Sequence, residues 1–374
     1  MKNFLRIASS AVLLLVLTNC SQKPQSALDT PEYHFKAGLR AVDTENLDNA
    51  KTSFQRAVDL DRKFAPAYAG LGLVCALQKN AQDAKMNVMK AAQFGADDAD
   101  ALALCGRVWI EMRDMDKTWF SKAEEYLTKA QRRDENHEAT IYYLGLANLY
   151  QYNFRNAEGF FKQVVDGKGE YAAKADGKWA LSQKVVRAVP GTMAGKKIAL
   201  QEKINRADLA VLFAEELKVG ELISKLPAPP AGFQTPGQMT AAEQRLQATD
   251  MQGHWAEVWV NEMVEYGVLE LGANGEFFPN ESISRANYAM AVQRLLVVAT
   301  RDNSLETRYF GESPSRFSDV PSSHFAYNAM ALCTERGIMQ ADVITGRFDP
   351  NGSVSGADAL LIIRTLQNSL RQTF

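Results

Sequence analysis

The stretch INRADLAVL (204–212) has a good helix N-cap, Asn205, at its second position. Apolar residues follow the cap at helical spacing. The same pattern returns as ISRANYAMA (283–291) and as VSGADALLI (354–362). Each copy predicts the first turns of an amphipathic helix. Three copies in one chain predict a repeated unit that is built around this helix.

The three copies differ at the residue after the cap, which is Arg206 in the first, Arg285 in the second and Gly356 in the third. A cation in the first turn of a helix opposes the helix dipole, which favours negative charge there. Helix capping therefore does not explain Arg206 and Arg285. We treat these two arginines as candidate functional residues, and note that the third copy lacks the charge.

The composition limits the functions that the chain can have. Its 374 residues are enough for two or three domains, each with its own core. Charged residues make up 23% of the chain and the formal net charge is −2, which argues against a nucleic-acid-binding surface or an acidic substrate channel. We expect no nucleic-acid partner.

Residues 1–19 have the pattern of a secretory signal. Lys2 and Arg6 precede the apolar run AVLLLVL, which is too short to span a bilayer because a spanning helix needs about 20 residues. The run ends in Leu-Thr-Asn-Cys20, which resembles the lipobox of bacterial lipoproteins. That resemblance implies lipidation of Cys20 and, because serine rather than aspartate follows it, an outer-membrane location facing the periplasm. We expect residues 20–30 to be a flexible tether.

Three further cysteines follow the lipobox, at Cys75, Cys105 and Cys333. Their odd number and their scattered positions on apolar helical faces do not fit a disulfide framework or a zinc site. We expect small buried core residues, with a Cys75–Cys105 disulfide as the alternative in an oxidising compartment. We expect neither a metal ion nor a cofactor.

The first half of the chain repeats with a period of 34 residues. Gly38, Gly72 and Gly106 are 34 residues apart and Gly145 follows after 39, so one unit carries a five-residue insertion. Small residues at a fixed point allow the two helices of a hairpin to pack closely. The period predicts four helical hairpins, over residues 31–64, 65–98, 99–137 and 138–170. A capping helix that ends at residue 189 completes this predicted domain, 31–189.

These units resemble tetratricopeptide repeats, with Tyr68, Leu71-Gly72 and Leu144-Gly145 among the matching residues. The resemblance implies a right-handed solenoid whose concave face, formed by the first helix of each hairpin, binds an extended or helical peptide. Projection onto that face predicts a peptide groove lined by Phe35, Leu39, Leu73, Arg107, Tyr142, Leu146, Leu149 and Tyr150. The mostly apolar lining favours an apolar peptide or a neighbouring domain as occupant. Internal packing of the same side chains is the alternative.

The second half, 190–374, contains a different repeat. Two segments, 248–299 and 316–367, align with each other at separations of 69 to 71 residues. Each contains an aspartate, a His-aromatic-Ala triplet, a glycine followed by an apolar residue, a Gly-x-Phe-x-Pro loop and the helix-start pattern. The first copy is incomplete: it covers 190–217 and is followed by a Pro-rich linker, 218–247.

This order of residues resembles the S-layer homology domain, most clearly in Phe317-Ser-Asp-Val-Pro321 and Gly346-Arg-Phe-Asp-Pro350. The first copy matches only in its second helix, and residues 181–191 are a candidate for its first. The resemblance implies three units in a pseudo-threefold prism, with grooves between neighbours that bind anionic cell-wall glycans.

The resemblance also implies roles for single residues. In the family the arginine of the second helix faces a groove and contacts carboxylate or ketal oxygens, which suits a bidentate guanidinium. Aromatic faces stack on sugar rings, and aspartates accept sugar hydroxyls. The implied glycan-binding residues are Arg206, Arg285, Asp250, Trp255, Asp319 and Phe325. Core packing of the two aromatic residues and local turn capping by the two aspartates are the alternatives.

No motif indicates an enzyme: the chain has no Gly-x-Ser-x-Gly, no His-Glu-x-x-His and no phosphate-binding loop. His254 and His324 are expected to start helices, since no acidic or cysteine partner stands at ligand spacing. We therefore expect an all-α, non-enzymatic, outer-membrane-anchored lipoprotein that contacts cell-wall glycan or peptidoglycan and binds a protein. The alternative is a pure interaction scaffold of a secretion or polysaccharide-export assembly, with the C-terminal units as a spacer.

Overall fold

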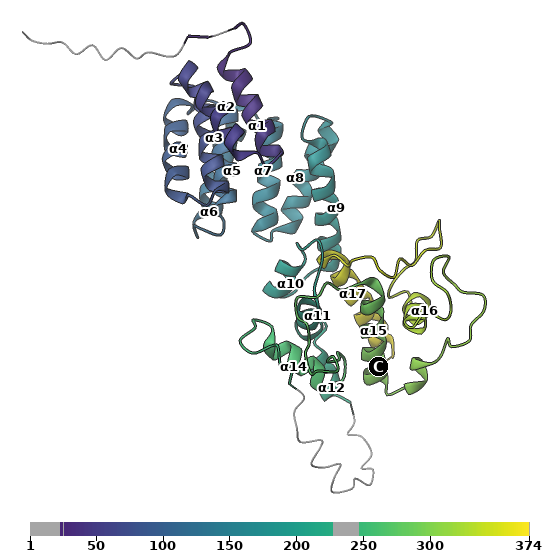
Figure 1. The fold of residues 1–374 in the computed structure, drawn as a ribbon. Helices are drawn as coiled ribbons and strands as arrows, with labels where there is room; N and C mark the ends of the chain where they lie inside the picture. Colours follow the sequence, from purple (N-terminus) through teal and green to yellow (C-terminus); the bar gives the residue numbers. More distant parts are fainter. Residues whose placement is uncertain (1–22, 25, 227–246, 374) are drawn as a thin grey trace, which may run out of the picture. The chain divides into compact units, whose positions relative to one another are not determined.

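The computed structural model describes residues 23–24, 26–226 and 247–373. These residues are all-α, as the sequence predicts, and within them no strand forms beyond two isolated β-bridges (Figure 1). The predicted signal segment, Cys20 and most of the Pro-rich linker lie outside the described residues. In the part of the chain described here, no helix combines the length and the apolar character needed to cross a bilayer.

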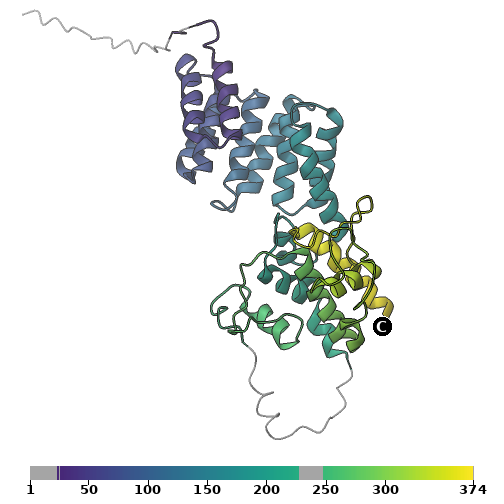
Figure 2. The same cartoon turned by 45° about the vertical axis from the view of Figure 1, so that its right-hand side comes forward.

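The first compact unit comprises the residues up to Gln151 together with Gln163–Ala172. Its helices pair in sequence order into hairpins, α1 with α2, α3 with α4 and α5 with α6 (Figures 1 and 2). The helices are α1 (Pro31–Asp43), α2 (Leu47–Leu60), α3 (Ala65–Leu77), α4 (Ala81–Phe94), α5 (Ala99–Glu111), α6 (Trp119–Arg133), α7 (Glu138–Tyr150) and the end of α8 (Phe154–Gly167). The predicted 34-residue period therefore corresponds to one hairpin in the structure.

The repeated small residues lie where neighbouring helices approach closely. A Cβ added at Gly38 would come within 2.5 Å of the Phe54 ring, and one at Gly106 within 2.5 Å of Leu127. Ala50 and Ala84, which repeat with the glycines, are fully buried. The period of the sequence thus reflects helix packing within each hairpin.

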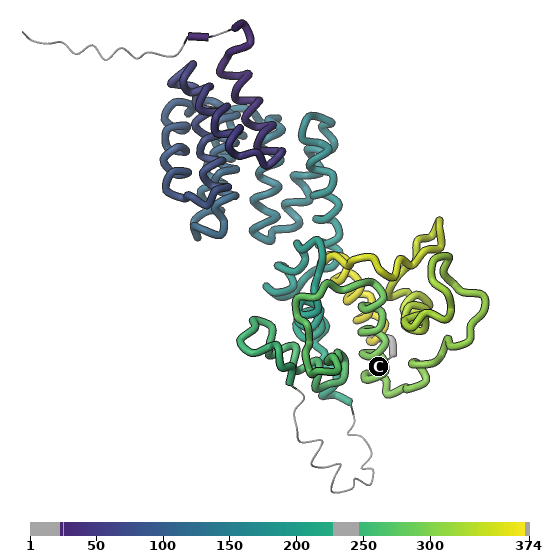
Figure 3. The backbone as a smooth tube through the Cα atoms, viewed as in Figure 1, coloured from purple at the N-terminus to yellow at the C-terminus, as the bar shows by residue number. Residues whose placement is uncertain are grey.

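The second compact unit comprises Tyr152–Lys162 and Ala173–Phe374. Its helices are α9 (Ala172–Ala188), α10 (Met193–Ile198), α11 (Arg206–Val211), a π-helical turn (Leu212–Glu216), α12 (Val219–Ser224), α14 (Glu257–Glu265), α15 (Arg285–Thr300), a 3-10 helix (Asn303–Glu306), α16 (Tyr327–Glu335) and α17 (Gly356–Thr373). In this unit α17 lies beside α10 and the π-helical turn, although it is far from both in sequence (Figure 3).

Helix α9 differs from the expectation that it ends the first domain. Nearly all of it belongs to the second unit, where the Lys184 amine pairs with Asp358 at 2.8 Å. The Arg364 guanidinium donates to the backbone carbonyls of Ala188 and Val189. The end of α9 is therefore attached to α17, and it overlaps the segment 181–191 that the sequence offers as the missing first helix of the first copy.

The cysteines of the described residues are free, so the Cys75–Cys105 disulfide considered as an alternative is wrong. Cys105 and Cys333 are buried, and burial raises the pKa of both thiols to about 12. These two are small core residues, as expected, whereas Cys75 is only partly buried.

Candidate functional site

The three copies of the nine-residue pattern meet in the second unit. The backbone N–H of Ile204 donates to the carbonyl of Val354 at 2.9 Å, and that of Ile283 donates to the carbonyl of Ile204 at 3.0 Å. These three residues hold the same position in their copies. The helix starts that the sequence repeats are thus joined directly to one another.

The residue after each cap binds the neighbouring unit through its backbone N–H. The three bonds are Arg206 to the carbonyl of Glu281 (2.9 Å), Arg285 to that of Gly352 (2.8 Å) and Gly356 to that of Gln201 (2.9 Å). Each unit therefore binds the next, and the third closes the ring on the first. We call these contacts the first, second and third junction, after Arg206, Arg285 and Gly356 respectively.

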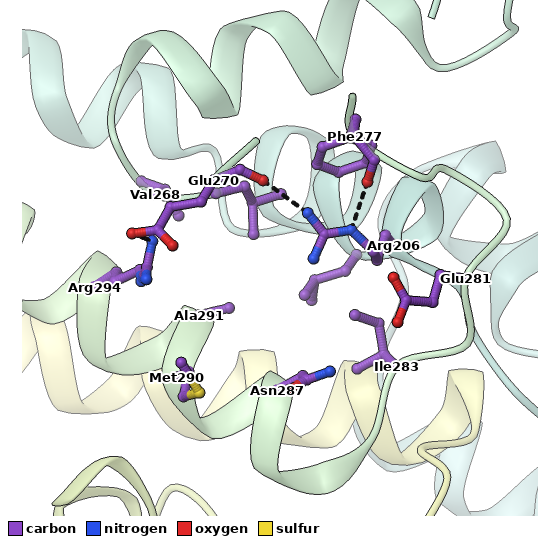
Figure 4. Close-up of a pocket in the computed structure, with 12 residues that line it drawn as sticks. Arg206, Val268, Glu270, Phe277, Glu281, Ile283, Asn287, Met290, Ala291 and Arg294 are labelled. Carbon is purple, nitrogen blue, oxygen red and sulfur yellow. Dashed lines mark hydrogen bonds and ion pairs between the residues drawn. The ribbon is translucent and has the colours of Figure 1, made fainter. Parts of the chain in front are cut away.

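At the first junction Arg206 fixes the loop of the second unit. Its Nε donates to the Phe277 carbonyl at 2.7 Å, its Nη2 donates to the Glu270 carbonyl at 2.8 Å, and the guanidinium lies 4.5 Å from the centre of the Phe277 ring (Figure 4). Nη1 has no hydrogen-bond partner among the described residues. Burial lowers the pKa of Arg206, but an arginine stays protonated at neutral pH.

At the second junction Arg285 makes the same contacts. Its Nε donates to the Phe348 carbonyl at 2.8 Å, its Nη2 donates to the Gln340 carbonyl at 2.7 Å, and the guanidinium lies 4.7 Å from the centre of the Phe348 ring. Both arginines therefore have a structural role, and two of the three guanidinium nitrogens are committed to it.

Asp250 and Asp319 support the loops that the arginines bind. Asp250 accepts the backbone N–H groups of Phe277 and Phe278, both at 2.7 Å. Asp319 accepts those of Phe348 at 2.9 Å and Asp349 at 2.8 Å. Both oxygens of each carboxylate are engaged, as the turn-capping alternative expects.

The two predicted aromatic residues are exposed, so core packing is wrong for both. Trp255 is 55% exposed and Phe325 is 73% exposed. The Phe325 ring stacks on His324 at 4.5 Å between ring centres. His254 and His324 were expected to start helices, but α14 and α16 begin three residues later, with Ala256 and Ala326 as N-caps. Each histidine lies in the turn before its helix, where its Nδ1 accepts the backbone N–H of that alanine at 3.2 Å.

The third junction leaves no space for a side chain after the cap. A Cβ added at Gly356 would lie 1.6 Å from the carbonyl oxygen of Ile198, the last residue of α10. Helix α10 is therefore the physical reason that the third copy has glycine where the others have arginine.

The buried carboxylate of Glu216 links two segments of the second unit that are far apart in sequence. The Glu216 side chain, only 1% exposed, accepts the backbone N–H groups of Gly191 and Thr192. It also pairs with the Arg364 guanidinium of α17 at 2.7 Å. This contact connects the loop before α10 to the last helix of the unit.

An open pocket of about 140 Å³ lies beside Arg206 at the first junction (Figure 4). Its polar wall contains a second guanidinium, Arg294, which pairs with the Glu270 carboxylate. Asn287 and Glu281 also line it. Arg294 was not among the predicted site residues. The aligned positions of the other copies hold Glu215 and Thr365, so this cation is specific to the second copy.

The residues of the predicted peptide groove fall into two groups. Leu73 is 0% exposed and Leu149 is 1% exposed, so internal packing applies to these two. Tyr142 and Leu146, at 9% exposed, are also buried and pack internally, while Phe35, Leu39, Arg107 and Tyr150 are partly exposed. Arg107 donates to the Tyr143 hydroxyl at 3.4 Å and lies 3.9 Å from Glu111. The partly exposed group is the surface that remains for a partner.

Among the described residues, no group of three histidine, cysteine, aspartate or glutamate side chains is placed to hold a metal ion. The polar groups gathered at the first junction are guanidinium, carboxylate and amide. They are suited to binding a polar ligand by hydrogen bonds and charge.

Comparison with known proteins agrees with the repeat in the second unit. The family model "S-layer homology domain" matches residues 249–289 and 316–360. A surface-layer 125 kDa protein of Lysinibacillus sphaericus is 31% identical over 109 residues, which is 29% of this chain and 8% of that protein. An amylopullulanase of Thermoanaerobacterium thermosulfurigenes is 26% identical over 135 residues, 36% of this chain and 7% of that protein.

The chain thus spans less than a tenth of either relative, and two of its segments match the S-layer homology domain. These segments associate the protein with the cell envelope or cell surface and are consistent with a cell-wall polysaccharide as partner.

Proposed function

We propose that the protein is a lipid-anchored envelope tether whose second unit binds an acidic cell-wall glycan at the first junction. The observation that carries this proposal is the free Nη1 of Arg206, which lies at an open pocket that also contains Arg294 (Figure 4). Two guanidinium groups at one pocket suit the oxygens of a carboxylate or ketal.

The surroundings of the second junction favour an acidic ligand less. Where the first junction has Arg294, alignment places Thr365, and where it has Asn287, alignment places Asp358. The negative charges of Asp349 and Asp358 both interact with the Arg285 guanidinium and raise its pKa, against the effect of burial. Carboxylates lie near both arginines, but an incoming anion would meet two guanidinium groups at the first junction and one at the second, so we assign the glycan to the first junction.

The other parts of the chain complete the tether. The lipobox-like sequence that ends at Cys20 supports attachment to the outer membrane, where each buried methylene of an acyl chain contributes about 0.8 kcal/mol. The hairpin array resembles tetratricopeptide repeats, which supports binding of a protein partner on the partly exposed groove residues. Several weak attachments on one chain hold it better than any single one.

The test is retention of the purified full chain on isolated cell-wall sacculi. Arg206→Gln should weaken binding about tenfold or more, since a hydrogen bond to a charged group contributes about 1.5–3 kcal/mol. Arg285→Gln is the matched control, because it loses the same two carbonyl contacts but no glycan contact, and it should bind within about twofold of the wild type. Equal losses for the two variants, or no loss, would contradict the assignment.

A second candidate function is a protein-interaction scaffold of a secretion or polysaccharide-export assembly. The observation that favours it is the engagement of both arginines with backbone carbonyls, which needs no ligand. It predicts no retention on sacculi. For either function we propose a non-enzymatic protein, so incubation with the same wall material should release no soluble product.

A further inference from the structure

We propose that the pocket beside Arg206 continues past the Arg294–Glu270 pair into a second cleft, so that the unit binds a glycan of at least two sugars, an acidic one next to a neutral one. This inference rests on the proposed glycan binding and adds the length and chemistry of the ligand.

The pocket of the first junction and the second cleft have lining residues in common. A cleft of about 290 Å³ lies between α15, the 3-10 helix and the start of α16. It shares three lining residues, Glu270, Met290 and Arg294, with the pocket of the first junction. One ion pair therefore separates two open spaces, and a chain of sugars can occupy both.

The second cleft has the chemistry of a neutral sugar site. Phe310 is 67% exposed and Phe325 is 73% exposed, and both line the cleft, so they offer apolar faces to the C–H groups of a sugar ring. Gln293 and Glu306 provide an amide and a carboxylate for hydroxyl groups. Its one cation, Arg294, is shared with the pocket of the first junction, so the second cleft has no positive charge of its own for a second acidic sugar.

Hydrogen bonds hold the polar wall in place. The Asn328 amide donates to the side-chain oxygen of Gln293 at 3.1 Å and to the Leu305 carbonyl at 2.7 Å, and its oxygen accepts the backbone N–H of Tyr309 at 2.8 Å. The amide nitrogen of Gln293 has no hydrogen-bond partner among the described residues. It is therefore positioned to donate to a ligand.

The cleft combines residues of the matched family segments, such as Glu270 and Phe325, with residues that lie outside them. Arg294, Glu306 and Phe310 lie between the two matched segments, which end at 289 and resume at 316. Ala329 of the cleft wall is aligned with Trp259 of the preceding copy. Trp259 is much larger than alanine, and its indole N–H donates to Glu215 at 2.9 Å. The aromatic-walled space is thus specific to one side of α15.

The experiment measures affinity as a function of ligand length by titration calorimetry of the full chain. The probes are N-acetylmuramic acid, which carries one carboxylate, and its disaccharide with the neutral N-acetylglucosamine. The wild type should bind the disaccharide about tenfold more tightly than the monosaccharide, as two ring contacts are added. The double variant Phe310→Ala/Phe325→Ala should lose this gain and keep its affinity for the monosaccharide. Tyr33→Ala, an exposed aromatic residue of the first unit, is the control and should change neither value.

The outcomes separate the two proposals. Binding of the monosaccharide without a gain for the disaccharide, or an equal gain in the double variant, overturns the second cleft and leaves the proposed function standing. Failure of the wild type to bind either probe or sacculi overturns the proposed function and this inference with it.

Discussion

At the first junction Arg206 shares its pocket with Arg294 and Asn287, whereas at the second junction the aligned positions hold Thr365 and Asp358. The backbone contacts of the two arginines are nearly identical, and each arginine lies against the phenylalanine ring of the next unit. A repeated arginine can therefore keep the same backbone contacts in different surroundings, and of these two junctions only the first has a second guanidinium beside the arginine.

The third junction extends the comparison. There the backbone of α10 occupies the space of the arginine, and the Glu216–Arg364 pair contributes the charged contact. The ring is thus closed in two chemically different ways, which substitutions can separate.

The largest expected effect is at the third junction. Arg364→Met would leave the Glu216 carboxylate buried without its cation, which should lower the free energy of unfolding of the second unit by about 3–5 kcal/mol. Hydrogen exchange of α15 and α17 measures it. Lys184→Met is the control, because its pair with Asp358 is 40% and 45% exposed and should change stability by less than about 1 kcal/mol. Equal effects of the two variants would show that Glu216 does not depend on its partner.

Gly356→Ala should have the next largest effect. The added Cβ requires Ile198 and α10 to move, so stability should fall by about 2–3 kcal/mol. Gly177→Ala in α9 is the control, since no atom lies within 4 Å of its Cβ position, and it should raise stability by up to about 1 kcal/mol. Denaturant unfolding of both variants is the measurement, and an unchanged Gly356→Ala midpoint would contradict the packing argument.

Asp319 should give a smaller, pH-dependent effect at the second junction. Burial raises the pKa of Asp319, but the hydrogen bonds from the backbone N–H groups of Phe348 and Asp349 together lower it by more. The pKa is therefore below its ordinary value. The ionised carboxylate therefore stabilises the fold above the unfolded pKa of about 3.9, and this contribution is lost as the pH falls through the folded pKa. Asp319→Asn should lower stability by about 1–2 kcal/mol at pH 7 and lose less than the wild type on acidification. Parallel stability curves against pH would refute this.

Glu270→Gln should have the smallest effect, a change in affinity for sacculi. The direction of this change tests whether the first junction differs from the second in binding the glycan. The substitution frees Arg294 from its carboxylate and gives the first junction the residue that the second has at the aligned position, Gln340. Affinity for sacculi should rise about threefold, as expected for one partly exposed ion pair. Gln340→Glu is the control and should leave affinity unchanged. Weaker binding of Glu270→Gln would mean that the carboxylate itself holds the ligand.

Much of the fold was predictable because its signals are local or periodic. The 34-residue spacing of Gly38, Gly72 and Gly106 predicted the hairpins, and the capping residues predicted the starts of α11, α15 and α17. The partners of Arg206 were not predictable, since they are backbone carbonyls and leave no trace in side-chain identity. Gly356 was seen as a missing charge, whereas its cause is a helix that is distant in sequence.

The candidate site was predicted only in part. Trp255 and Phe325 were named but with core packing as the alternative, because a sequence does not reveal which face of an aromatic ring is covered. Arg294 and Phe310 have no counterpart in the repeat, so pattern matching passed over them. Residues that differ between the copies therefore contribute to the candidate site as much as residues that repeat.

In the tether proposed above, the attachment of α9 to α17 determines how a pulling force reaches the second unit. A pulling force that enters at residue 173 reaches the Lys184 and Arg364 contacts before it reaches the ring of helices. Because Arg364 binds the carbonyls at the end of α9 and also pairs with the buried Glu216, the load passes from the end of α9 to the contacts near the third junction through one side chain.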